Sequence, residues 1–127
     1  SDQMFEELFI PGIIRECQHM DHCIYHLDGP QALRYLDRLL EIPEIQAIQW
    51  VPGAGHGGWR GSVPVYQRIQ NKGKAFYVEP VPAQDLDEFF TQLAPEGVWI
   101  SAVTGVATIA EADAVTAKIA GWTRRKG

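Results

Sequence analysis

Polar side chains with catalytic or ligand-binding chemistry stand at the ends of four short apolar segments of this 127-residue sequence. The four sets are His26 with Asp28, Gln49 with Trp50, Glu79, and Ser101 with Thr104. In parallel α/β folds, ligands bind outside the carboxyl ends of the strands, so we expect these side chains to converge. Polar groups gathered there would cost desolvation free energy unless they faced a cavity or a partner. The pattern therefore predicts a small-molecule site.

Three of these residues are the candidates for catalysis. His26 could transfer a proton near neutral pH or bind a metal, and its alternative role is a hydrogen bond to a neighbouring loop. Asp28 could be a second ligand or could orient His26, although an Asp before Gly-Pro is also a good helix N-cap. Glu79 could act as a base or a ligand, or could be a carboxylate on a surface loop.

A glycine-rich loop at residues 53–61 follows the second apolar segment. It matches neither the dinucleotide-binding fingerprint nor a P-loop. The loop predicts a mobile active-site lid, with a flexible connection as the alternative. Arg60 could hold a substrate carboxylate, and Trp50 or Trp59 could stack on a flat ligand. The expected substrate-binding residues are Gln49, Trp50, Gly53, Gly55, His56, Trp59, Arg60 and Ser101.

A second group of metal-ligating residue types, at positions 17–23, does not predict a metal site. His22 and His26 lie four strand residues apart, which is about 13 Å. They therefore belong to opposite ends of one strand. The cysteines, Cys17 and Cys23, are too few for a disulfide framework.

The elements that must position the site alternate between strands and helices. We expect strands at 23–27, 47–51, 75–79 and 98–103, with helices near 30–41, 62–73, 86–93 and 108–120. A leading helical segment at 1–21, broken at Pro11-Gly12, precedes four βα units at 22–127 in one domain. This order predicts an α/β fold with a parallel sheet covered by helices. Two architectures fit, an open flavodoxin-like sandwich and half of a (β/α)8 TIM barrel.

Three segments tip the choice between these architectures. They are YHLDG at 25–29, IQAIQWVPGAG at 45–55, and the closing strand and helix at 97–122. Together they resemble the C-terminal half of the uroporphyrinogen decarboxylase superfamily, most of all its methyltransferase-like branch of the trimethylamine corrinoid protein type. The resemblance implies a (β/α)8 barrel that decarboxylates uroporphyrinogen or moves methyl groups between corrinoid and thiol carriers.

The resemblance also implies a zinc site, which this sequence matches only in part. Zinc-dependent methyltransferases of the family carry His-x-Cys at this strand end and a later cysteine. His26 matches the histidine, Asp28 replaces the first cysteine, and residues 98–107 contain no cysteine. A thiolate-rich zinc site is not supported, whereas a His/carboxylate site of His26, Asp28 and Glu79 remains chemically possible.

Charge and composition limit the classes of partner that this chain could bind. The net charge of -5 and a pI near 5.3 argue against nucleic acid or an anionic membrane as a partner. No apolar run approaches a membrane span, and the start of the chain is polar, so we expect a cytoplasmic protein. Four parallel strands leave two unpaired edges, which predicts a homodimer or dependence on a missing N-terminal half-barrel.

Three hypotheses for function follow. The first is a methyltransferase-like half-barrel acting on a small methylated or corrinoid-linked substrate, with a corrinoid protein as partner. The second is a module that binds a corrinoid or a small anion without chemistry. The third is a barrel fragment with no activity of its own.

Overall fold

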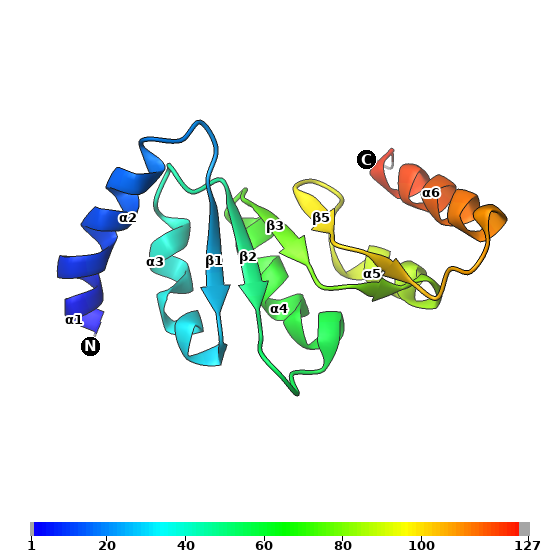
Figure 1. Cartoon of the computed structure of the whole chain (residues 1–127), viewed down its shortest axis with the longest axis horizontal. Helices are drawn as coiled ribbons and strands as arrows, with labels where there is room; N and C mark the ends of the chain where they lie inside the picture. Colours follow the sequence, from blue (N-terminus) through cyan, green and yellow to red (C-terminus); the bar gives the residue numbers. More distant parts are fainter. Residues whose placement is uncertain (1, 125–127) are drawn as a thin grey trace.

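A four-stranded parallel sheet forms the centre of the computed structural model, which describes residues 2–124. Its strands are β1 (Ile24–Asp28), β2 (Ala47–Val51), β3 (Ala75–Val78) and β5 (Val98–Ile100). Their order in the sheet, β1-β2-β3-β5, follows the order along the chain (Figure 1). The predicted parallel α/β fold is confirmed. The reversal of strand order that defines a flavodoxin-like sheet is not found in residues 2–124.

Helical segments connect these strands. They are η2 (Pro30–Tyr35), a 3-10 helix, with α3 (Leu36–Leu40); α4 (Gly58–Asn71); and η3 (Ala83–Asp85), also 3-10, with α5 (Leu86–Gln92). Figure 1 shows α3 and α4 on the same side of the sheet. The helix expected at 30–41 is thus mostly 3-10 in its first half, and α4 begins four residues earlier than expected. Gly73, with φ of +70°, follows α4 as a glycine at the helix C-terminus.

The sheet has one covered face and one open face. Side chains alternate between the faces of a strand, and the covered face is the buried one. Its central residues are at most 4% exposed: Ile48, Trp50, Phe76 and Val78. The open face carries His26, Gln49, Tyr77 and Trp99 in one row, because these residues are opposite one another in the strand register. Trp99 is 59% exposed, so helices cover the sheet on one side alone.

The fourth predicted strand is divided in two. After β5, a second strand β6 (Val103–Thr104) pairs in parallel with β4 (Val81–Pro82), outside the main sheet. The chain therefore leaves the sheet at Ser101, and the final helix α6 (Ile109–Thr123) lies away from β5 (Figure 1). A capping box of Thr108 and Glu111 opens α6, with both reciprocal hydrogen bonds present.

The N-terminal segment is helical throughout. It consists of α1 (Asp2–Met4), a π-helical turn η1 (Phe5–Phe9) and α2 (Ile10–Cys17). The predicted break at Pro11-Gly12 is wrong, because the helical backbone continues from η1 into α2 across these residues. Phe5 stacks on Tyr35 with ring centroids 3.9 Å apart, which fixes this segment beside η2.

None of the helices in residues 2–124 combines the length and the apolar character needed to cross a bilayer.

Candidate functional site

His26 and Gln49 form the best-defined polar contact on the open face. The His26 Nδ1 atom lies 2.9 Å from Gln49 Oε1. An amide oxygen only accepts, so Nδ1–H donates and the Nε2 atom keeps its lone pair. The two strands bring the pair together because His26 and Gln49 are directly opposite in the β1-β2 register. The result is an exposed, oriented imidazole near the carboxyl ends of two strands.

Asp28 lies on the same face of β1 as His26, two residues further along. The rise of a strand separates the two by roughly 6.6 Å along the chain. The alternative role of Asp28 as a helix cap is wrong, because η2 follows Gly29 and no side chain caps it. Gly29 instead has φ of 80° and donates its N–H to the carbonyl of Val51 at 2.9 Å. Asp28 therefore remains an exposed carboxylate beside His26.

Glu79 does not join this pair. Strand β3 ends at Val78, and the Glu79 carboxylate accepts a hydrogen bond from Ser62 Oγ of α4 at 3.3 Å. Its backbone N–H donates to the Tyr66 hydroxyl at 3.4 Å. Burial raises the pKa of Tyr66 to about 12, so this phenol stays protonated and neutral. Glu79 is therefore held against α4, on the covered side of the sheet.

Trp50 belongs to the same buried network. It is 4% exposed, and its indole N–H donates to Ser62 Oγ at 3.1 Å. The prediction that Trp50 stacks on a flat ligand is therefore wrong. Ser62 is a buried residue inside α4 at 1% exposure, and it links Trp50 to Glu79.

A three-ligand zinc site is not formed. In the part of the chain from residue 2 to residue 124, no group of three or more His, Cys, Asp or Glu side chains could hold a metal ion. His26 and Asp28 face the open side, while Glu79 turns to α4. His26, Asp28 and Glu79 therefore do not form one three-residue metal site, and the pair of His26 and Asp28 stays a prediction.

Both cysteines are free, as expected, and are buried packing residues. The Cys23 thiol lies 3.4 Å from the carbonyl oxygen of Cys17, to which it donates. Burial raises the pKa of Cys17 to about 11, which leaves the thiol protonated and unreactive.

The predicted lid at 53–61 is loop at residues 53–57 and helix at residues 58–61. Because α4 begins at Gly58, Trp59 and Arg60 lie in its first turn. Trp59 is buried, and its indole N–H donates to Asp85 Oδ2 at 3.3 Å. The remaining loop at 52–57 carries the exposed His56, whose carbonyl oxygen lies so close to Gly61 that a Cβ there would clash with it. Trp59 and Arg60 belong to α4 and not to this loop, so they are not part of a mobile lid.

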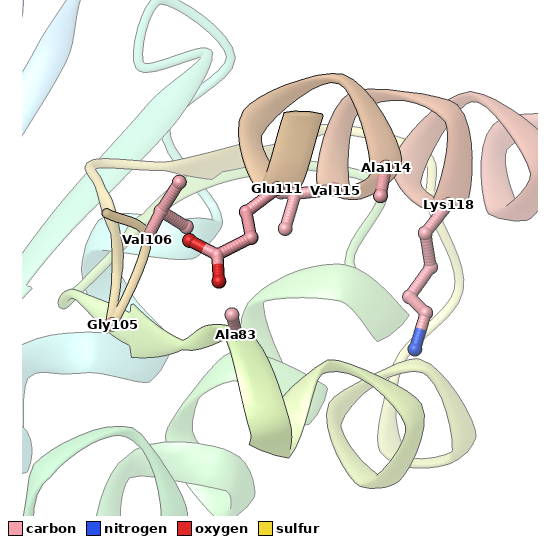
Figure 2. A pocket seen from close by; sticks show the side chains of 7 residues that line it. All are labelled: Ala83, Gly105, Val106, Glu111, Ala114, Val115 and Lys118. Carbon is pink, nitrogen blue, oxygen red and sulfur yellow. The ribbon is translucent and has the colours of Figure 1, made fainter. Parts of the chain in front are cut away.

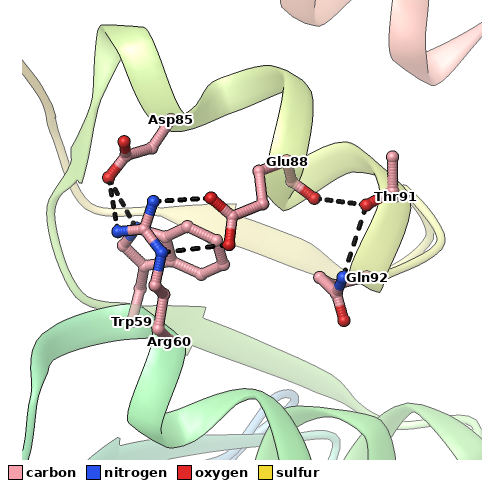
Figure 3. Close-up of polar contacts among 6 residues, drawn as sticks. All are labelled: Trp59, Arg60, Asp85, Glu88, Thr91 and Gln92. Atoms are coloured by element: carbon pink, nitrogen blue, oxygen red, sulfur yellow. Dashed lines mark hydrogen bonds and ion pairs between the residues drawn. The ribbon is translucent and has the colours of Figure 1, made fainter.

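Arg60 has its charge satisfied within the chain (Figure 3). Its guanidinium pairs with Asp85 at 2.8 Å and with both oxygens of Glu88 at 3.0 and 2.6 Å. It also lies over the Trp59 ring, 4.6 Å from the ring centroid. Hydrogen bonds from Arg60 lower the pKa of both carboxyls. Two protein carboxylates already pair with Arg60 through three of its five N–H donors, so a substrate carboxylate would have to compete with Asp85 and Glu88 for the guanidinium.

The other expected site residues lie near the strand ends without specific contacts to His26. Gly53 and Gly55 have φ of 80° and 85°, a conformation that suits glycine. Ser101 donates its backbone N–H to the Val78 carbonyl at 3.0 Å. Its hydroxyl is buried, with no hydrogen-bond partner among the described residues. Thr104 lies in β6, outside the main sheet.

Sequence reasoning missed the aromatic part of the open face. Tyr77 and Trp99 meet edge to face with ring centroids 5.3 Å apart. With Ile24 and Gln49 they line a shallow hollow of about 260 Å³. Strict alternation within 75–79 and 98–101 would have placed both rings on the face of His26, opposite the apolar residues of the core.

A second hollow, of about 300 Å³, lies between α6 and the start of η3 (Figure 2). Glu111 and Lys118 are its charged lining residues. The Glu111 carboxylate accepts from the backbone N–H groups of Ala107 and Thr108, which lowers its pKa. Lys118 pairs with Asp87 at 2.8 Å. Both charges are used within the chain, so this hollow offers no free charge to a ligand.

Comparison with protein-family models, with characterised protein sequences and with solved structures found no match to this chain.

Proposed function

We propose that this chain is one half of a uroporphyrinogen decarboxylase-like (β/α)8 barrel, with a methyltransferase-like site for a small molecule at the carboxyl end of its open face. The observation that carries the proposal is the His26–Gln49 pair. It places an oriented imidazole on the one face of the sheet that helices leave uncovered. Consecutive strand order supports the barrel, because each strand of such a barrel lies beside the next. The reaction type comes from the sequence resemblance.

His26 is the proton acceptor in this proposal. Gln49 keeps the hydrogen on Nδ1, so Nε2 can accept the proton of an incoming thiol. The sulfur electron pair then forms the new bond to the methyl carbon, and the cobalt of the methylated corrinoid substrate keeps the electrons of the broken bond. Asp28 lies on the same face of β1, two residues further along the strand.

Methyl transfer from methylcobalamin to a small thiol such as homocysteine tests the proposal. Under anaerobic conditions, the fall in methylcobalamin absorbance with time gives the rate. We expect His26→Ala to lower the rate by about 100-fold, the lower end of the range for a general base. Gln49→Leu should lower it less, because the imidazole remains and only its tautomer is freed.

The matched control is His22→Ala, which removes an exposed histidine before the amino end of β1. It should leave the rate unchanged. Turnover by His26→Ala at the rate of the unchanged chain would overturn the role of His26. A folded chain with no turnover above the free reaction would overturn the proposed function and favour a barrel fragment that is inactive alone.

A further inference from the structure

Two strand edges of the main sheet have no neighbour in residues 2–124. The sheet ends at β1 on one side and at β5 on the other. Cys23 O accepts a hydrogen bond from β2, and Gly29 N donates one to it. Because alternate residues of a strand direct their backbone groups to opposite sides, the amides of residues 24, 26 and 28 point away from β2, toward the unpaired edge. Gly97 O and Ser101 N bond to β3, which leaves the amide of Ile100 pointing outward from β5. Such rows of unpaired groups are templates for further strands.

The surface area of the chain points to a missing partner. The chain exposes 7813 Å², whereas a compact monomer of 14.2 kDa exposes about 6,800 Å² by the scaling of surface with mass. The surplus is about 1,000 Å², somewhat above the roughly 800 Å² that each partner buries in an interface of standard size. Part of it is apolar, since Trp99 and Ile24 on the open face are 59% and 53% exposed.

We propose that a second copy of this chain covers the open face and closes an eight-stranded parallel barrel. A two-fold axis along the strand direction keeps all strands parallel. It places β5 of each copy beside β1 of the other, so one symmetry operation pairs both free edges. An eight-stranded barrel is just wide enough for inward side chains to fill it. Those side chains would be the Tyr77 and Trp99 rings with Ile24 and Gln49 from each copy.

The helices at the two ends of the sheet also complement each other across the proposed pairing: the flank of β5 is incompletely covered, and the helices beyond β1 expose apolar side chains. On β5 the covered-side residues Val98 and Ile100 are only half-buried, whereas Phe76 and Val78 on β3 are at most 1% exposed. Trp122 is the one buried residue of α6 that the structure records, so α6 leaves the flank of β5 open. Beyond β1, the N-terminal helices expose Leu8 and Phe9 at 67% and 56%. The two-fold axis brings these side chains to the uncovered flank of β5 in the other copy.

The candidate site is incomplete without this second copy. Four strand ends surround half of a barrel mouth, and closure sets the His26–Gln49 pair of one copy across from that of the other. Only this last consequence rests on the proposed function. The pairing itself rests on the edges, the surface area and the helical layer.

Native mass spectrometry and sedimentation equilibrium between about 1 and 100 µM test the pairing. We expect a species of twice 14.2 kDa that dissociates on dilution. Trp99→Lys should give a monomer at 100 µM, because it places a charge from each copy inside the closed barrel. The matched control is Ile109→Lys, which adds the same charge at an 83% exposed position on α6 and should remain dimeric.

Amide hydrogen exchange identifies the surface that pairs. The amides of Ile24, His26, Asp28 and Ile100 should exchange slowly in the dimer and quickly after dilution. A monomer at 100 µM, or a dimer in which these amides exchange as fast as in the monomer, would overturn the inference. A dimer without methyl transfer would leave the inference standing and remove the proposed function, and a monomer with methyl transfer would do the reverse.

Discussion

The two faces of the main sheet carry similar aromatic pairs but differ in how far these side chains are buried. On the covered face, Phe76 stacks on Tyr66 of α4 with ring centroids 5.2 Å apart, and both rings are at most 1% exposed. On the open face, the neighbouring Tyr77 meets Trp99, which is 59% exposed. Similar aromatic pairs therefore stand on both sides, yet only one pair is removed from water. The covered face stabilises this chain, whereas the open face leaves an aromatic pair in contact with water.

The largest expected effect is at the centre of the covered face. Phe76→Ala removes a buried ring from between the sheet and α4, which should cost about 3–5 kcal/mol of unfolding free energy. Urea denaturation followed by circular dichroism measures this loss. The matched control is Tyr77→Ala, one residue along and on the opposite face, which should cost far less. Equal losses for the two variants would contradict the division between the faces.

The next effect concerns the polar groups that the covered face buries. Ser62→Ala leaves the Trp50 indole N–H and the Glu79 carboxylate without their shared partner. A buried donor left unsatisfied costs about 1–3 kcal/mol. The control is Ser101→Ala, since that buried hydroxyl has no partner within residues 2–124 and its removal should be neutral or slightly stabilising. A destabilisation by Ser101→Ala as large as that by Ser62→Ala would show that the hydrogen bonds of Ser62 contribute little.

The bounds of the strands can be predicted from the sequence more reliably than the direction of the side chains at the strand ends. The segments 47–51 and 75–79 match β2 and β3 within one residue, because apolar runs bounded by Gly, Pro and Lys leave few other registers. The same pattern predicts that Glu79 converges with the other polar residues at the strand ends. Its direction instead follows from Ser62, 17 positions away in sequence, and such a long-range contact leaves no local signal.

The start of α4 was also beyond local reasoning. Glycines at 57, 58 and 61 with Pro64 inside the helix are poor helix-forming residues, so the segment reads as a loop. Tertiary contacts outweigh that preference, because Trp59 and Arg60 bind Asp85 and Glu88 only if the helix already begins at Gly58. The same contacts turn both residues away from the candidate site, which leaves the His26–Gln49 pair as the part of the expected convergence that the structure brings together.

A smaller effect, dependent on pH, should appear at the Arg60 cluster on the covered side. Arg60 lowers the pKa of Asp85 and Glu88 in the folded chain, so the stabilisation is present above the ordinary pKa of these carboxyls. It is lost as the pH falls through the lowered folded-state values. Arg60→Met should therefore be less stable than the unchanged chain at pH 7, and the difference should shrink toward pH 2. Melting temperatures across this range measure it, and a difference that grew at low pH would contradict the assignment.

The smallest expected effect is on the open face, at its largest side chain. Trp99→Ala should change the unfolding free energy of the dilute chain by no more than about 0.5 kcal/mol, as at other exposed positions. A buried Trp→Ala change would cost about 3–5 kcal/mol instead. Denaturation near 1 µM, where the chain is dissociated, measures the value for one copy alone. A loss that stays small when dilute and becomes large at 100 µM would place Trp99 in the interior that two copies share, whereas a large loss at both concentrations would mean that the open face is already part of the core of a single chain.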